Sequence, residues 1–154
     1  MQKLLFLLSL SFSFSAQAAD FDYAAYEDIE LSAADVSLPV DPSVNYLLDA
    51  AQPRYHTVAT YTGKTRHIDR ATKSFIATWV KATKHPRSYR RFFQHEVEIV
   101  QGSKTYLMPI QEILLSPFKR EVVAGTKVHL YVLLMGAASR AHVFAISEFN
   151  AVSG

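Results

Sequence analysis

The chain has 154 residues, no cysteine, a formal net charge of +2 and 49% hydrophobic residues. This length is typical of one globular domain, and 12% aromatic residues with only 19% charged residues provide enough apolar material for a core. The composition therefore excludes a chain that is disordered throughout. The lack of cysteine excludes a disulfide scaffold, thiol catalysis and a cysteine-ligated metal site.

Residues 1–18 have the pattern of a signal peptide. One cation, Lys3, precedes an apolar run of leucine and phenylalanine, and Ala16 and Ala18 give the small-x-small pattern that signal peptidases cleave. A transmembrane anchor would need about 20 apolar residues, whereas serines at positions 9, 11, 13 and 15 interrupt this run. We therefore expect cleavage after Ala18, a mature chain without a transmembrane span, and a periplasmic or secreted location.

Charge divides the mature chain into two parts. Residues 19–50 contain eight acids and no lysine or arginine, a net charge of −8, whereas residues 51–154 contain 15 lysines and arginines against six acids, a net charge of +9. We therefore predict an acidic N-terminal arm with a short helix over residues 19–52 and one small domain over residues 53–150. Three uses of the charge remain open: the arm and the domain pair internally, the basic part binds an anionic partner, or it is a solvated face.

The first elements expected in the mature chain are a helix and a strand. Asp41 followed by proline is typical of a helix N-terminus, and apolar residues then keep helical spacing over residues 44–51. Residues 55–61 are rich in threonine, valine and tyrosine, which predicts a strand that ends at Gly63.

Residues 66–84 fit a helix better than a strand. Apolar residues fall on one side at 100° per residue, and lysines and arginines fall on the opposite side. The apolar side consists of Ile68, Ala71, Phe75, Ile76, Trp79 and Val80. Residues 75–81 alone could instead form a strand that is apolar on both faces. We favour an amphipathic helix with a basic outer face that ends before Pro86.

From residue 89 on, apolar segments separated by turn residues predict four strands in two hairpins. These strands are expected over residues 93–100, 105–110, 127–135 and 140–149. Between the hairpins, residues 111–123 can form one broken helix or two short ones.

This order of elements predicts a mainly β fold: a small, curved antiparallel barrel with one amphipathic helix and short helices. An oligonucleotide/oligosaccharide-binding (OB) barrel carries its helix between the third and fourth strands, where residues 111–123 fall. The resemblance is one of layout, because no residue motif indicates a family. An SH3-like barrel and an α+β sheet packed on the helix of residues 66–84 remain alternatives.

Residues with catalytic potential are few. His95, His129 and His142 lie on three predicted strands and could converge as metal ligands, although no HExxH or His-x-His spacing occurs. Glu96 and Glu98 share one strand face, either as a pair of catalytic carboxylates or as part of a solvated face. The chain has no G-x-S-x-G, P-loop or dinucleotide motif. We therefore predict no catalytic residue, no metal ligand and no cofactor.

One basic aromatic segment is the candidate binding site. Residues 84–93 read KHPRSYRRFF, in which cations stand beside aromatic rings. This combination binds anionic polymers through charge and ring stacking. The candidate binding residues are Lys84, Arg87, Tyr89, Arg90 and Arg91. The alternative is a solvated loop whose Phe92 and Phe93 turn into the core.

We therefore expect an exported, non-enzymatic binding module. Its partner would be an anionic envelope polymer, a lipid surface or an acidic protein, and export argues against nucleic acid. Two other functions stay open: an envelope hydrolase that uses a metal or paired carboxylates, and a structural subunit of an envelope assembly in which the acidic arm docks on a neighbour.

Overall fold

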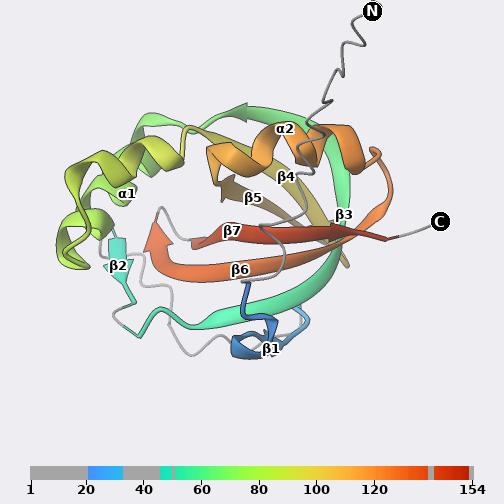
Figure 1. Cartoon of the computed structure of the whole chain (residues 1–154), viewed down its shortest axis with the longest axis horizontal. Helices are drawn as coiled ribbons and strands as arrows, with labels where there is room; N and C mark the ends of the chain where they lie inside the picture. The colour runs from blue at the N-terminus through green and yellow to red at the C-terminus, as the bar shows by residue number, and fades with distance from the viewer. Residues whose placement is uncertain (1–20, 33–45, 50, 139–140, 153–154) are drawn as a thin grey trace, which may run out of the picture.

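The computed structural model describes residues 21–32, 46–49, 51–138 and 141–152 (Figure 1). The predicted signal peptide and its cleavage site lie outside these ranges, as does the expected helix start at Asp41. The fold is mainly β, as the sequence predicts. In the described ranges no helix is long and apolar enough to cross a membrane.

Seven strands in the described residues form one sheet with the order β1-β3-β4-β5-β7-β6-β2. They are β1 (Glu27–Asp28), β2 (Tyr46–Leu48), β3 (Arg54–His67), β4 (His95–Gln101), β5 (Lys104–Ile110), β6 (Lys127–Ala138) and β7 (Ala141–Ala151). The strand β3 also pairs with β6, so the path β3-β4-β5-β7-β6 returns to β3. This is possible because the first half of β3 pairs with β6 and its second half with β4.

The strand β3 runs beyond its expected end at Gly63. The register with β4 shifts between Tyr61 and Thr65, and Gly63 has a φ of +92° within this irregularity. Glycine adopts this conformation without the strain of a side chain. A bulge therefore bends β3 where the sequence suggested a turn.

Residues 70–82 form the helix α1 (Arg70–Ala82), which confirms the helical interpretation of this stretch. The Asp69 side chain caps the helix by accepting a hydrogen bond from the Thr72 N–H at 2.7 Å. A short 3-10 helix, η3 (Arg87–Phe92), follows, and another, η2 (Tyr23–Ala25), precedes β1. The segment over residues 111–123 contains one helix, α2 (Glu112–Glu121), which continues through Pro117.

Within the helix predicted over residues 44–51, residues 46–48 form the strand β2, and the described residues 49 and 51 are not helical, so that prediction is wrong there. Residues Tyr46–Leu48 pair antiparallel with Gly136–Ala138 at the end of β6, which itself continues through the turn expected after residue 135. A side chain at Gly136 would collide with this strand, since a Cβ there would lie 2.0 Å from the Leu47 carbonyl oxygen. Backbone pairing with β6 thus overrides a weak local helix preference.

Two apolar clusters stabilise the fold. One lies inside the ring of strands and includes Leu130 and Phe118, both fully buried; Phe118 comes from α2. The other lies between α1 and the ends of β6 and β7, where Trp79 and Phe93 are buried. Phe93 therefore turns into the core, while Phe92 stays 49% exposed.

Candidate functional site

The predicted binding residues lie on η3 and on the turn that joins it to α1. Lys84, Arg87 and Arg91 are exposed, whereas Tyr89 and Arg90 are half-buried. The helix η3 packs against α1, and this brings the predicted cations to the same region as the exposed cations of the helix. We call this set the basic surface: Arg70, Lys73, Lys81, Lys84, Arg87, Arg90 and Arg91.

Tyr89 packs against neighbouring rings. Its ring stacks on His85 with centroids 4.5 Å apart and planes 10° apart, and it meets Phe92 edge-on at 4.8 Å. Its ring also lies 6.3 Å from that of Trp79 on α1, so Tyr89 helps to fix η3 beside α1. The exposed ring of this segment is Phe92.

The charges of the basic surface are unpaired in the part of the chain that the structure describes. Among the described residues, none of its cations lies within 4.0 Å of a carboxylate. The one acid within residues 66–91, Asp69, is engaged at the start of α1. The hydrogen bond from the backbone N–H of Thr72 is the main reason that the pKa of Asp69 is lowered from its ordinary value of 3.8.

A small hollow lies within the basic surface. Lys73, Arg90 and Arg91 line it together with Gln94 and three apolar residues of the second cluster, and its volume is about 240 Å³. The Gln94 amide donates a hydrogen bond to the Arg90 carbonyl oxygen at 3.1 Å. Three cations from two elements thus surround an apolar floor, which suits an anionic group attached to a less polar unit.

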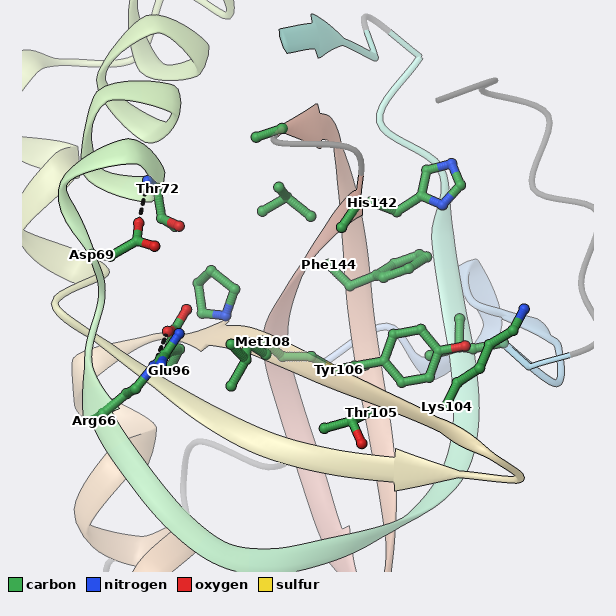
Figure 2. A pocket seen from close by; sticks show the side chains of 16 residues that line it. Arg66, Asp69, Thr72, Glu96, Lys104, Thr105, Tyr106, Met108, His142 and Phe144 are labelled. Atoms are coloured by element: carbon green, nitrogen blue, oxygen red, sulfur yellow. Dashed lines mark hydrogen bonds and ion pairs between the residues drawn. The ribbon is translucent and has the colours of Figure 1, made fainter. Parts of the chain in front are cut away.

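A larger cleft of about 530 Å³ lies between β5, β7 and the start of α1 (Figure 2). On one side, the Arg66 Nε lies 2.5 Å from the Glu96 carboxylate, which is 2% exposed. On the other, the rings of Tyr106 and Phe144 meet edge-on with centroids 6.5 Å apart. Burial raises the pKa of Tyr106 above its ordinary value of 10.0, so its hydroxyl keeps its proton at neutral pH.

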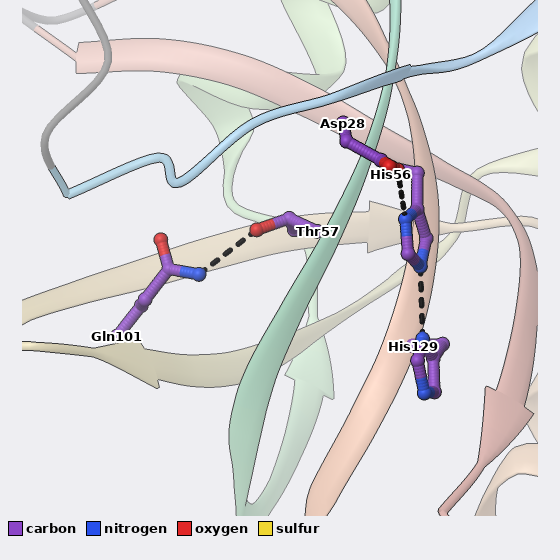
Figure 3. Close-up of polar contacts among 5 residues, drawn as sticks. All are labelled: Asp28, His56, Thr57, Gln101 and His129. Atoms are coloured by element: carbon purple, nitrogen blue, oxygen red, sulfur yellow. Dashed lines mark hydrogen bonds and ion pairs between the residues drawn. The ribbon is translucent and has the colours of Figure 1, made fainter.

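The first part of the acidic arm docks on the opposite side of the ring of strands from the basic surface. In Figure 1, β1 lies at the bottom of the view and α1 at the upper left. A polar chain joins three strands there: Asp28 Oδ1 lies 2.5 Å from His56 Nδ1, and His56 Nε2 lies 2.9 Å from His129 Nδ1 (Figure 3). Three arm rings also surround Tyr131 on β6, those of Phe21, Tyr23 and Tyr26.

The arm is also tied to the β4–β5 hairpin through Gln101. The Gln101 side-chain oxygen accepts a hydrogen bond from the Ser32 N–H of the arm at 3.0 Å. The Gln101 amide nitrogen donates a hydrogen bond to Thr57 Oγ1 of β3 at 2.8 Å (Figure 3). In the described part of the arm, no acid forms an ion pair with the basic surface.

The histidines considered as metal ligands lie in three separate environments. His95 contacts Glu112 at 2.6 Å, His129 contacts His56, and His142 lines the cleft. Across the described ranges, no group of three histidine or acidic side chains is arranged to hold a metal ion.

The two candidate carboxylates of β4 are both engaged by cations of β3. Glu96 is paired with Arg66, and Glu98 lies 3.3 Å from Lys64. These ion pairs give the carboxylates a role in joining β3 to β4.

Sequence reasoning missed the cleft and the Asp28–His56–His129 chain. Both depend on strand pairings between segments far apart in the sequence. Comparisons with family models, with curated proteins and with solved structures found no match to this chain.

Proposed function

We propose that this chain is an exported, non-enzymatic module that binds an anionic polymer through the basic surface. The observation that carries the proposal is the set of seven cations on α1, η3 and the turn between them without an acidic partner among the described residues. The hollow lined by Lys73, Arg90 and Arg91 gives one charged unit of the polymer a place to bind. The exposed ring of Phe92 adds a surface for stacking.

A polymer suits this surface because its cations are spread along two elements. Each exposed ion pair contributes only about 0–1 kcal/mol, so affinity requires several contacts at once. A chain with a charge on each repeating unit supplies them. We expect the polymer to be a sulfated, phosphorylated or carboxylated envelope component, since the predicted signal peptide directs the protein out of the cytoplasm.

The proposal includes the finer fold, an OB-like barrel formed by β3, β4, β5, β7 and β6. Three features support it: the strand pairings return to β3, β5 runs parallel to β7, and α2 lies between β5 and β6, which are the third and fourth of these five strands in chain order. In OB barrels, the loop between the first two strands is one of the binding loops. The corresponding segment here, between β3 and β4, contains α1 and η3.

The test is retention on immobilised heparin and on phosphatidylglycerol vesicles across a salt series. Charge reversal of Arg87, Arg90 and Arg91 to glutamate should abolish retention at physiological salt, because the contacts act over a Debye length of about 8 Å. The matched control reverses three exposed cations elsewhere, Lys119, Arg120 and Lys127.

The control variant has the same net charge as the first variant, so it should lose little retention if the basic surface is the site. Equal loss in both variants would mean that net charge alone is responsible and would contradict the proposal. Retention on heparin without retention on vesicles would identify a polysaccharide rather than a lipid surface.

A further inference from the structure

The cleft beside Tyr106 is lined by the edges of two strands. Its lining includes every residue of β5 from Lys104 to Pro109 and every residue of β7 from Ala141 to Phe144. Side chains alternate between the two faces of a strand, so a face of a strand would contribute only every second residue. Consecutive lining residues indicate that the backbone edges of β5 and β7 face the cavity.

The register of the strands identifies which backbone groups face the cleft. The Gln111 N–H donates to the Ile146 carbonyl oxygen of β7 at 3.4 Å. Backbone groups point to alternate sides along a strand, so those of Thr105, Leu107 and Pro109 also point towards β7. The groups of the intervening residues point to β4, with which β5 pairs along its whole length.

In the described part of the chain, β5 and β7 share a single register pair, Ile110 with Ile146. The N–H and C=O groups of Thr105 and Leu107 therefore face the cavity and not a neighbouring strand. Pro109 fits the same arrangement, because proline is found where its nitrogen is not needed by a sheet partner.

The side chains around this edge differ on its two sides. Met108 and Phe144 are buried on the inner side together with the half-buried Tyr106. On the outer side, Leu107 is 40% exposed. Lys104 shares the inner face with Tyr106 by the alternation of the strand, and it stands at one end of the cleft without an ion pair among the described residues (Figure 2).

We propose that the open edge of β5 in this cleft binds an extended peptide from a partner protein as an additional strand. The peptide's backbone pairs with Thr105 and Leu107, its apolar side chains at alternate positions contact Tyr106 and Phe144, and an acidic residue at its end contacts Lys104. An extended peptide meets the open N–H and C=O groups of an edge with the periodicity of a strand, which is the basis of recognition by β-strand addition. This site is separate from the basic surface and does not depend on the polymer that the surface binds.

The test uses a synthetic peptide, Ac-Asp-Val-Thr-Val-Thr-Val-Asp-amide, with amide hydrogen exchange of the protein measured by NMR. When nine-tenths of the protein is bound, exchange at Thr105 and Leu107 should slow about tenfold, because only the free fraction exchanges. The amides of Tyr106 and Met108, which point to β4, should not change. This alternation is specific to strand addition.

Two methylated peptides and two variants serve as controls. N-methylation of the valines and N-methylation of the threonines remove opposite sets of donors, so one peptide should lose binding at least tenfold and the other should retain it. Leu107→Pro removes a donor from the open edge and should weaken binding at least tenfold. Leu107→Ala keeps the N–H and should bind within about threefold of the unchanged protein.

Several outcomes would overturn the proposal. These are an absence of binding at about 1 mM peptide, equal binding of both methylated peptides, or slowed exchange at every residue of β5. Slow exchange of Thr105 and Leu107 in the free protein would mean that the chain itself covers this edge. The exchange pattern requires no substitution, so the test stands even if Leu107→Pro fails to fold.

Discussion

Asp69 caps the helix α1, which carries much of the basic surface, so its replacement tests the link between local structure and binding. Its carboxylate accepts a hydrogen bond from the Thr72 N–H at 2.7 Å. Replacing an aspartate at this position by alanine typically lowers the free energy of unfolding by about 0.5–2 kcal/mol. We expect Asp69→Ala to fall in this range at pH 7, because α1 packs on the sheet through four buried residues and its loss exposes that cluster.

The same interaction predicts a dependence on pH. The pKa of Asp69 is lower in the folded protein than its ordinary value of 3.8, chiefly because the Thr72 backbone N–H stabilises the charged form. The charge therefore stabilises the fold fully above pH 3.8, and this contribution is lost as the pH falls through the folded pKa. Asp69→Asn keeps a side-chain acceptor but has no charge to lose, so it should remove this pH dependence while retaining most of the cap.

Urea unfolding of the three proteins at pH 7 and pH 3 measures both effects. The difference in unfolding free energy between the unchanged protein and Asp69→Ala should shrink at pH 3. A difference that is equal at both pH values, or an alanine variant as stable as the original at pH 7, would refute the role of Asp69 as a charged cap. Separately, heparin retention of the folded variants at pH 7 shows whether α1 must be intact for binding.

Three further predictions follow from other parts of the chain. Leu130→Ala removes a fully buried side chain from the ring of strands and should lower the free energy of unfolding by about 2–5 kcal/mol, as measured in urea; a change below 0.5 kcal/mol, roughly the effect of a surface substitution, would contradict this packing. Gly136→Ala should increase amide exchange in β2, because the new Cβ collides with that strand, whereas Gly125→Ala has a similar backbone penalty but an open surrounding and should not. The exported protein should begin at Ala19 by mass spectrometry, and an intact N-terminus would rule out the signal peptide.

Much of the fold is predictable where the signal is local. The apolar period of α1 spans several turns, and all four buried residues of the helix belong to the predicted apolar side. Of the other two residues predicted on that side, Ile68 is buried just before the helix begins, and Ala71 is exposed. The hairpin β4–β5 follows from alternation around a turn at Gly102, whose φ is +60°. In both cases neighbouring residues carry the information.

The parts that could not be predicted depend on residues distant in sequence. The strand β2 exists because β6 offers it a partner, and His56 meets His129 across 73 positions. The cleft arises because β5 and β7 pair at one position and then separate. A single sequence indicates where strands form but does not give the register between strands that are far apart in the chain.

The position of the arm bears on whether it neutralises the basic surface. The strand β1 pairs with β3 at Tyr55 and His56, while α1 begins after the other end of β3 at His67. In Figure 1, β1 lies at the bottom of the view and α1 at the upper left, and no acid in the described part of the arm forms an ion pair with the basic surface. Exposed charges farther apart than the Debye length of about 8 Å at physiological salt are largely screened, so we expect the acids beside β1 to act weakly on the basic surface.

Neutralising acids in this part of the arm should therefore leave polymer binding nearly unchanged. In the variant Asp22→Asn, Glu27→Gln and Glu30→Gln, the salt concentration that elutes the protein from heparin should stay within about 10% of the original value, because screened charges contribute little. The control repeats the measurement at low salt, where screening weakens and a modest increase is expected. A large increase at physiological salt would mean that these acids oppose polymer binding directly, and the arm would then act as an internal competitor for the basic surface.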